Sequence, residues 1–577
     1  MPLDPITVDT GTPSSATNSG SRSRRSVIRE GVLIGLLALT LNLIGNGRMS
    51  LWDRDEPRYA GATREMRQSG DWVHPTFNAE PRYHKPILIY WLMLAGTAIG
   101  GDTPFGARLV SALMGTSTVV LMWWWGRRVL GDRVGRLGAL VLTTMPLMVA
   151  ESKLATTDAT LTFFFVGCQI ALWELWQRPS RGAAAVFWAL LGLAVLTKSP
   201  AAPVLLVASA ITAWICGGPN PLTYLSRLRW RWGPLLFAAI VVPWNVAIFL
   251  RSHGEYFNVA IGFHVIKRAT RQLEEHGGFP GYYVVLGMAS LFPWSALLPR
   301  ALVSAWSGRK ETPLVGFLFG WVVGPLILLE CVRTKLIHYY LPAVPAAALL
   351  VAWRLALSSD AKLKVPSWRL GRFALAMIAT FGFVITACLV GGGLRFFPSG
   401  MQAPALALAA LIGAATVFSL RELSAGRIER AIPGGIAFTA VSLATFAGWF
   451  LPAAEPYRTS AVVGHRLAAL ETSLGVRSLL SSYKPPGTIF ALGHPATLVQ
   501  SWEQFLKEVN QSGKILLPLM PGELSRLQRN PRFITEIQET VSGFNVEKAQ
   551  PETLYLTLVR PNTSPVATGP SNHPVTR

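Results

Sequence analysis

The chain has 577 residues, of which 51% are hydrophobic and only 15% are charged, and its mean hydropathy is +0.37. This composition is too apolar for a soluble protein and indicates a chain that crosses a membrane many times. The formal net charge is +22, but most Lys and Arg residues lie in short loops between apolar segments. Since such loops fix the orientation of membrane proteins, the charge does not indicate a nucleic-acid partner.

The first 28 residues are rich in Ser, Thr, Gly and Pro and end in a basic cluster. We expect residues 1–28 to form a disordered cytoplasmic tail ahead of the first membrane span. The apolar run 31–46 is followed by no small-residue cleavage site, so we interpret it as a retained anchor and not as a cleaved signal peptide.

Apolar segments recur from residue 31 to residue 451. If the short segment 87–101 dips into the membrane or lies at its surface, about 13 transmembrane helices remain. All the basic loops then fall on one face, which the excess of Lys and Arg marks as cytoplasmic. The fourteen segments are 31–46, 87–101, 107–126, 137–151, 158–176, 183–197, 201–217, 234–250, 281–298, 314–331, 338–353, 372–391, 402–420 and 432–451.

The opposite, external face receives the chemically unusual segments. The distribution of Lys and Arg alone places these segments on one face, so we predict a single external site. They are the loop 51–86, the residues around Asp158, Lys198, the loop 251–280, the segment 333–340 and the tail after residue 452.

The tail from residue 453 to residue 560 differs in character from the membrane domain 29–452. Its apolar runs are short, as in strands, and alternate with helical stretches, so we predict a small soluble α/β domain on the external face. Residues 561–577 are rich in Pro, Ser, Thr and Asn, and we expect them to be disordered. The predicted strands are 487–492, 514–519 and 554–559, and the predicted helices are 501–510 and 521–528.

An acidic and aromatic cluster at 52–59 (WDRDEPRY) directly follows the first apolar run. Carboxylates at a membrane surface are costly to desolvate, so they are candidates for proton transfer or cation binding. A solvated loop beside the membrane is the alternative. On an ideal helix the side chains of Asp55 and Glu56 diverge by about 100°, so we expect one to act and the other to support it.

Pro57 predicts that Asp55 and Glu56 lie in a turn just before a helix at the membrane surface. The first residues of this helix are then Arg58 and Tyr59, and its N-terminus suits an anionic phosphate. The stretch 63–70 is amphipathic and ends in a Gly that suits a C-cap.

Several cations and one further carboxylate are candidates on the same face. Lys85 precedes an apolar stretch and is either a phosphate ligand or a lysine that reaches up to the membrane surface. Asp158 opens an apolar helix and is either an N-cap or a site residue. His264, Lys267 and Arg268 lie at helical spacing, at which they could share one anion.

A site with carboxylates, cations and aromatic rings but no thiol suits the transfer of a group from a lipid phosphate. Carboxylates deprotonate or orient an acceptor, and cations stabilise the departing phosphate. A Ser or Cys nucleophile has no supporting motif in the sequence. The four cysteines form no C-x-x-C pair, so the sequence predicts neither a disulfide framework nor a metal site.

These residues resemble a known family. The run DRDEPRYA at 53–60 resembles the first external loop of the GT-C fold glycosyltransferases, in the superfamily of the bacterial aminoarabinose lipid A transferase and the protein O-mannosyltransferases. The similarity runs from about residue 51 to residue 345, and the small C-terminal domain also resembles the tails of such proteins. Further matching blocks lie, in order, at 64–66, 69–72, 85–86, 90–91, 153–158, 196–200, 243–244, 276–278, 292–294, 334–336 and 338–342.

The resemblance implies an inverting hexosyl or pentosyl transferase whose donor is a sugar linked to undecaprenyl or a related polyprenyl phosphate. It implies Asp55 as the catalytic carboxylate, with Glu56 beside it and Asp158 as a second acidic residue. Transferases that modify lipid A often carry a Glu-His pair with Arg three residues on, whereas here Phe263 precedes His264. The phosphate ligands and the acceptor therefore stay open. The resemblance implies Lys85 and Arg268 as ligands of the lipid phosphate, with Lys335 and Tyr339 or Tyr340 beside them. The further candidates for binding the lipid phosphate or the sugar are Arg58, Tyr59, Tyr83, Lys198 and His264.

The sequence as a whole predicts a multi-pass enzyme of the bacterial inner membrane, with a cytoplasmic N-terminus and a periplasmic site. We expect it to move a sugar to lipid A or a related envelope glycolipid. The alternatives are a protein O-glycosyltransferase and a transporter for lipid-linked precursors, although no internal repeat supports a transporter. The expected partners are membrane lipids, the lipid-linked donor and a glycolipid or protein acceptor, but no nucleic acid. We expect a monomer and no required cofactor, with metal dependence left open.

Overall fold

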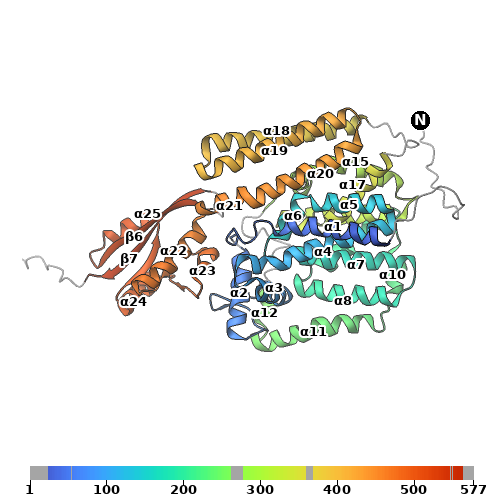
Figure 1. Cartoon of the computed structure of the whole chain (residues 1–577). Coiled ribbons are helices and arrows are strands. Elements are labelled where there is room, and N and C mark those ends of the chain that lie inside the picture. Colours follow the sequence, from blue (N-terminus) through green and yellow to red (C-terminus); the bar gives the residue numbers. More distant parts are fainter. Residues whose placement is uncertain are drawn as a thin grey trace, which may run out of the picture. The chain divides into compact units, whose positions relative to one another are not determined.

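The computed structural model of the chain describes residues 24–53, 55–260, 277–358, 368–545, 548 and 550–562 (Figure 1). The chain divides into two compact units. The first, which we call the membrane unit, comprises Met1–Met49, Met66–Pro75 and Arg82–Ala453. The second, the C-terminal unit, comprises Ser50–Glu65, Thr76–Pro81 and Ala454–Arg577, so part of the loop predicted at 51–86 packs with the C-terminal residues. Most of the two predicted disordered tails lies outside the described residues.

The prediction of a mainly helical, polytopic membrane protein is confirmed. Within the described residues, nine helices are long and apolar enough to cross a membrane. The helices from the N-terminus to residue 454, apart from α2, are α1 (Arg24–Leu43), α3 (Leu88–Gly100), α4 (Pro104–Leu130), α5 (Asp132–Thr143), α6 (Pro146–Lys153), α7 (Asp158–Gln177), α8 (Arg181–Thr197), α9 (Ala201–Ile215), α10 (Pro221–Arg227), α11 (Gly233–Ser252), α12 (Glu255–Phe257), α14 (Tyr282–Ser290), η2 (Trp294–Ala296), α15 (Leu298–Gly308), α16 (Pro313–Cys331), η3 (Ile337–Ala343), α17 (Val344–Ser358), α18 (Trp368–Gly391), η4 (Gly392–Phe396), α19 (Ser399–Ser424), α20 (Ile428–Thr445), η5 (Phe446–Phe450) and α21 (Leu451–Ala454).

Two of the predicted apolar segments are broken. The segment 137–151 consists of α5 and α6, which meet at a bend of 60°. Pro146 begins α6, where a missing N–H costs nothing, and it cannot continue the hydrogen-bond ladder of α5. The segment 281–298 consists of α14, η2 and the start of α15. Three further helices, α3, α8 and α9, are apolar but shorter than a full span, so the count of thirteen crossings stays a prediction.

Small residues let helices of the membrane unit approach closely. A Cβ added at Gly320 of α16 would lie 2.5 Å from the Cα of Ala213 on α9, and one at Gly324 would lie 2.6 Å from the carbonyl carbon of Ala208. Close backbone approach of this kind is how helices gain packing contacts in a lipid environment. Helices α7, α8 and α11 run alongside one another in the same unit (Figure 1).

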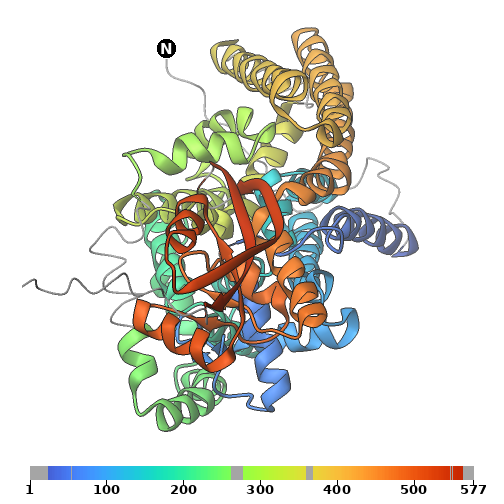
Figure 2. The ribbon, with the colours of Figure 1, turned by 90° about the vertical axis from the view of Figure 1, so that its left-hand side faces the viewer.

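The C-terminal unit contains a three-stranded antiparallel sheet in the order β5-β7-β6. The long strands β6 and β7 curve beside one another in Figure 2, where they are red. The described elements of this unit are α2 (Asp55–Ser69, up to Glu65), β1 (Thr76–Phe77), β2 (Glu80–Pro81), η6 (Glu455–Tyr457), α22 (Thr459–Leu474), β3 (Leu479–Leu480), α23 (Pro486–Leu492), β4 (Thr497–Leu498), α24 (Trp502–Ser512), β5 (Ile515–Leu519), α25 (Pro521–Gln528), β6 (Phe533–Asn545) and β7 (Gln550–Pro561).

Most of the elements predicted in this region are confirmed. The strands at 514–519 and 554–559 are β5 and part of β7, and the helices at 501–510 and 521–528 are α24 and α25. The strand predicted at 487–492 is wrong, because these residues form α23. Pro486 occupies the first helical position and Gly493 follows the helix at a φ of 84°, so both ends carry residues that favour a short helix. Strand β6 was missed because charged residues interrupt its apolar positions.

The predicted turn at Asp55 and Glu56 is also wrong. Helix α2 begins at Asp55, so Pro57 lies inside its first turn. The first-turn N–H groups have no partner within a helix, and a proline is therefore tolerated there. The predicted end of the helix is confirmed, since Gly70 follows Ser69 at a φ of 70° and its N–H donates to the Met66 carbonyl.

Lys153 stabilises the C-terminal end of α1. Its Nζ donates to the carbonyls of Leu41, Asn42 and Ile44 at 3.1, 3.3 and 2.5 Å. We expect Lys153→Met to lower the thermal unfolding midpoint of the purified protein, because each buried carbonyl left without a partner costs about 1–3 kcal/mol. Lys310→Met, at an exposed lysine of the same unit, is the matched control. Equal midpoints for the two variants would contradict the capping role.

Candidate active site

A cavity of about 600 Å³ lies within the membrane unit. Four residues predicted from widely separated parts of the sequence line it together: Lys85, Asp158, Lys198 and Tyr339. Lys85 precedes α3, Asp158 begins α7, Lys198 follows α8, and Tyr339 lies in η3. The fold therefore brings these four predicted site residues to one place.

Asp158 and Lys198 form an ion pair in this cavity. Lys198 Nζ lies 2.7 Å from Asp158 Oδ1, and the two side chains are only 15% and 7% exposed, in that order. The same Nζ lies 4.8 Å from the ring centroid of Tyr339, within the range of a cation–π interaction. Asp158 is not an N-cap, because it is already helical and Thr157 holds the cap position. The carboxylate is therefore directed to Lys198, which it holds in the cavity.

Lys85 and Tyr83 lie on the segment that leads into α3. Lys85 is half-buried, and its Nζ donates to the His84 carbonyl at 3.3 Å. Tyr83 is buried, and its hydroxyl lies 2.7 Å from Nε2 of His74. Burial, and next the carboxylate of Glu255, raise the pKa of Tyr83 above its usual range. Tyr83 thus supports this segment by packing, while Lys85 lines the cavity.

The rest of the cavity wall is largely apolar. Helices α9, α11 and α16 contribute to it, together with residues of α7, α8 and α12. A cavity with two lysines in one part and an aliphatic wall elsewhere is suited to a molecule with an anionic head and a hydrocarbon chain. The apolar lining residues include Val204, Leu205, Val241, Leu328, Leu329 and Val332.

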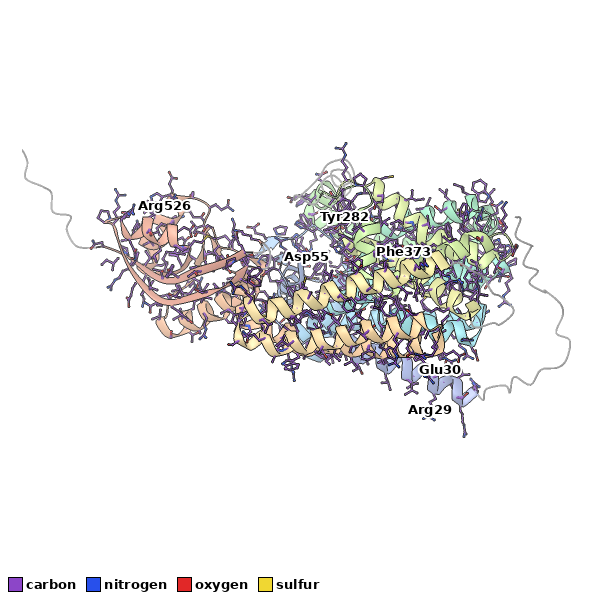
Figure 3. The ribbon with its side chains drawn as sticks, turned by 90° about the horizontal axis from the view of Figure 1, so that it is seen from above. Arg29, Glu30, Asp55, Tyr282, Phe373 and Arg526 are labelled. Carbon is purple, nitrogen blue, oxygen red and sulfur yellow. The ribbon has the colours of Figure 1, made fainter. Side chains whose placement is uncertain are left out.

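Asp55 and Glu56 belong to the C-terminal unit, in which they have different surroundings. Asp55, labelled in Figure 3, is exposed in the first turn of α2. Glu56 is only 1% exposed, and its carboxylate accepts the N–H of Trp52 at 2.8 Å. Arg58 is half-buried and Tyr59 is buried in the same turn. Of the two acidic residues, Asp55 is therefore the accessible one, and Glu56 fixes the backbone ahead of it.

Other predicted residues lie apart from this cavity or beyond the described part of the chain. His264 and Arg268 are outside the described residues. Lys335 is buried and pairs with Glu330, whose carboxylate also accepts the N–H groups of Gly281 and Tyr283. Tyr340 is buried as well, with its hydroxyl 3.5 Å from the Val322 carbonyl.

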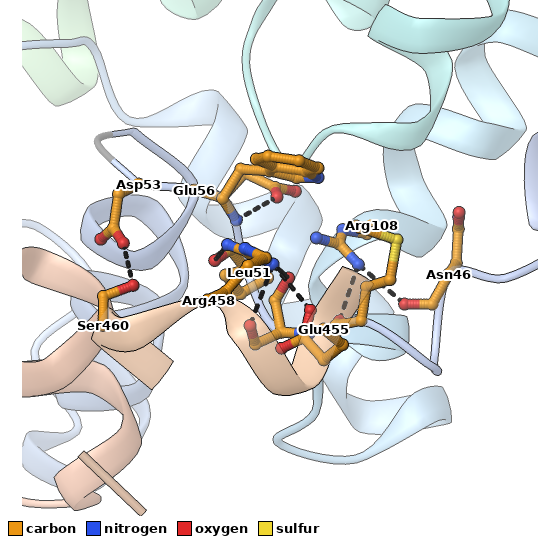
Figure 4. Close-up of polar contacts among 11 residues, drawn as sticks. Asn46, Leu51, Asp53, Glu56, Arg108, Glu455, Arg458 and Ser460 are labelled. Carbon is orange, nitrogen blue, oxygen red and sulfur yellow. Dashed lines mark hydrogen bonds and ion pairs between the residues drawn. The ribbon is translucent and has the colours of Figure 1, made fainter. Parts of the chain in front are cut away.

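Sequence reasoning missed two residues of the cavity in the membrane unit and one residue of the C-terminal unit. Trp244 and Tyr256 line the cavity with their rings edge to face, 5.1 Å apart. The buried Arg458 binds the backbone ahead of α2 (Figure 4). An arginine just past the last apolar segment, three residues after Glu455, was the signal for it in the sequence. Among the described residues, no group of three or more His, Cys, Asp or Glu side chains could hold a metal ion.

Comparison with solved structures defines the class of fold. The crystal structure of ArnT from Cupriavidus metallidurans bound to undecaprenyl phosphate superposes with a TM-score of 0.71 and 20% identity, covering 93% of this chain and 98% of that one. The apo structure of the same protein gives a TM-score of 0.70, also at 20% identity, and covers 92% of this chain and 98% of its own. The predicted GT-C fold of a multi-pass membrane protein is therefore confirmed.

Sequence comparison points to a particular group with this fold. The undecaprenyl phosphate-alpha-4-amino-4-deoxy-L-arabinose arabinosyl transferase of Pseudomonas aeruginosa is 33% identical over 314 residues, which are 52% of this chain and 55% of that relative. This chain thus spans about half the length of that relative. The enzyme of the same name from Pectobacterium carotovorum is 27% identical over 476 residues, which are 79% of each chain. Residues 29–254 match the family described as dolichyl-phosphate-mannose-protein mannosyltransferase.

The ion pair between Asp158 and Lys198 offers a test of the cavity. We expect Asp158→Asn to destabilise the protein by about 3–5 kcal/mol, because it leaves a buried ammonium without its carboxylate. The double variant Asp158→Asn with Lys198→Met should recover part of the loss, as measured by unfolding of all four proteins in detergent.

A matched control is the pair of Arg127 and Asp132, which has the same separation of 2.7 Å but is more exposed, at 21% and 46%. Asp132→Asn should cost no more than about 1 kcal/mol. If both Asn variants lost the same free energy of unfolding, the pair in the cavity would be no better shielded from water than the exposed pair.

Proposed function

We propose that the protein is a membrane glycosyltransferase that takes a sugar from a polyprenyl phosphate, with undecaprenyl phosphate as the carrier. The observation that carries this proposal is the cavity in which Lys85 and Lys198 lie against an aliphatic wall. The similarity to arabinosyl transferases and to an undecaprenyl phosphate-bound structure supports the choice of carrier. The acceptor that fits this similarity is lipid A or a related envelope glycolipid.

In this proposal the two lysines bind the lipid phosphate. Charge-assisted hydrogen bonds from ammonium groups are shorter and stronger than neutral ones, and they favour the phosphate most as it gains charge on departure. Asp158 keeps Lys198 oriented until the phosphate arrives, and the ring of Tyr339 lies against the same ammonium. The aliphatic wall takes the first part of the polyprenyl chain.

Asp55 is the proposed general base. The hydroxyl oxygen of the acceptor forms a bond to the anomeric carbon while the bond from that carbon to the phosphate oxygen breaks. The acceptor proton passes to Asp55, and the polyprenyl phosphate leaves from the opposite side of the carbon, so the configuration inverts. Where the acceptor is itself an ionised phosphate, Asp55 orients it and accepts no proton.

The reaction is proposed to take place on the periplasmic side of the inner membrane, with the basic loops and the N-terminus in the cytoplasm. A second candidate is a protein O-glycosyltransferase, which is favoured by the match of residues 29–254 to a family named for protein mannosylation. Purified protein supplied with donor and with either a glycolipid or a peptide acceptor distinguishes the two. Net movement of donor across sealed vesicles, without release of undecaprenyl phosphate, would instead indicate a transporter.

Lys85 tests the donor site. We expect Lys85→Ala to weaken the binding of undecaprenyl phosphate about tenfold to a hundredfold, because a charge-assisted hydrogen bond contributes roughly 1.5–3 kcal/mol. Lys85→Arg should restore binding only in part, since a planar fork does not reproduce a point charge. Lys310→Ala is the control, and the measurement is equilibrium binding in detergent. Unchanged binding in the Lys85 variants would move the phosphate site elsewhere in the chain.

Asp55 tests the chemistry. We expect Asp55→Asn to lower the transfer rate by at least about 10²-fold, because a positioned base typically contributes 10²- to 10⁴-fold, while donor binding stays unchanged. Glu503→Gln, at an exposed carboxylate on α24, is the control. A variant that keeps more than about a tenth of the wild-type rate would refute the role of Asp55 as a base.

A further inference from the structure

Arg458 binds the backbone that leads into α2. Its guanidinium donates to the carbonyls of Ser50 and Leu51 at 3.1 and 2.8 Å, and also to the Ser50 hydroxyl. The side chain is only 4% exposed and lies 4.3 Å from the ring centroid of Trp52. Glu455 completes the arrangement, because its carboxylate accepts from both Arg458 and the Ser50 N–H (Figure 4). We call this group the Arg458 clamp.

Asp53 forms a second attachment just ahead of α2. Its carboxylate accepts the hydroxyl of Ser460 and, at 2.5 Å, the N–H of Gly487 in the first turn of α23. A Cβ at Gly487 would lie 2.7 Å from an oxygen of Asp53, so only glycine leaves room for this contact. An acidic group at the N-terminus of a helix also has the sign that the helix dipole favours.

The C-terminal end of α23 contacts the body of α2. Arg64 donates to the Phe490 carbonyl at 2.8 Å, and its guanidinium lies 3.8 Å from the Phe490 ring centroid. Asn78, on the turn that connects β1 and β2, exchanges two hydrogen bonds with the backbone of Ala496. Helix α23 therefore has an acidic partner, Asp53, at its N-terminus and a basic partner, Arg64 of α2, at its C-terminus.

These contacts involve residues before and after Asp55 in the chain. They are connected to the turn that contains Asp55 through its neighbour Glu56. The Glu56 carboxylate accepts the Trp52 N–H, which joins the first turn of α2 to the backbone that the clamp holds. Asp53, two residues before Asp55, is fixed separately. Within the C-terminal unit, the start of α2 is thus defined by residues some 400 positions later in the chain, as the separations of 405 and 434 for two of these bonds show.

We propose that the C-terminal residues 455–496 act in catalysis by setting the position of Asp55, with Arg458 and Asp53 as positioning residues. This inference rests on the proposed function. The contacts are made to the main chain of residues 50–52 and to the carboxylate of Asp53, all ahead of the helix, so they constrain where the helix begins and which way its first turn faces. A displacement of about 1 Å in a reacting group can lower a rate by 10²-fold, so such a support has a direct effect on turnover.

The experiment compares full-length variants purified in detergent. Arg458→Ala and Asp53→Asn should lower kcat by roughly tenfold to a hundredfold. Their affinity for undecaprenyl phosphate should stay unchanged, since none of the clamp residues lines the cavity. Arg458→Lys should recover part of the rate, because an ammonium keeps the charge but not the fork that reaches two carbonyls. Arg466→Ala, at a largely exposed arginine of α22 with one ion pair to Glu539, is the matched control and should keep the wild-type kcat.

Hydrogen exchange gives a second readout, which does not depend on activity. Amide exchange in residues 50–58 should be faster in Arg458→Ala and Asp53→Asn than in the wild type and in Arg466→Ala. If either variant fails to fold, Ser460→Ala removes a single hydroxyl from Asp53 and should show the same two effects in smaller measure.

Three outcomes decide the matter. A folded Arg458→Ala with the wild-type kcat overturns the inference and leaves the proposed function standing. A parallel loss of kcat and of donor affinity also overturns it, because general damage then explains both. A wild-type protein that neither binds nor turns over any polyprenyl phosphate-linked sugar overturns the proposed function, and the inference with it.

Discussion

The ion pair between Asp158 and Lys198 sets the character of the cavity in the membrane unit. Neither charge could be kept alone at such low exposure, because removing an ion from water costs several kcal/mol even after the protein relaxes. Each residue therefore requires the other. The pair also keeps an ammonium at the edge of an aliphatic wall, where an unpaired lysine would turn toward water. An anion that enters the cavity meets a cation that is already desolvated and oriented.

Basic side chains have a second use in this protein, as donors to backbone carbonyls where the chain leaves α1. Lys153 donates to carbonyls at the end of α1, and Arg108 donates to the carbonyls of Asn46 and Met49, which follow that helix. In the C-terminal unit, Arg458 donates to the carbonyls of Ser50 and Leu51. Some of the Lys and Arg residues that give the chain its net charge of +22 therefore bind backbone carbonyls, besides those that set the orientation in the membrane. Irregular backbone near a membrane needs internal donors, and arginine and lysine supply them over a long reach.

The length of the apolar runs was enough to predict a helical membrane protein, since hydrophobic runs of this length have few other uses, but it did not predict the breaks in the segments 137–151 and 281–298. The composition of the first loop made Asp55 and Glu56 candidates, but it did not predict that Glu56 is buried and bonded to the Trp52 N–H while Asp55 is exposed. The start of α2 was mispredicted because a proline is tolerated in the first turn of a helix, so Pro57 does not exclude Asp55 and Glu56 from α2. The partners of Asp53 could not be predicted either, because Ser460 and Gly487 lie more than 400 positions later in the chain. Arg458 escaped notice because two of its partners are backbone carbonyls, which every residue has.

The size of the cavity has a practical consequence for biochemistry. A space of about 600 Å³ is too small to enclose a long polyprenyl chain, so most of such a chain would remain in the bilayer and add little to recognition. A carrier shortened to a few isoprene units should then be recognised by its head alone and stay soluble enough for stopped-flow work. Under the proposed function, detergents with phosphate in their head groups would compete with the donor for Lys85 and Lys198, because they carry the same charged group.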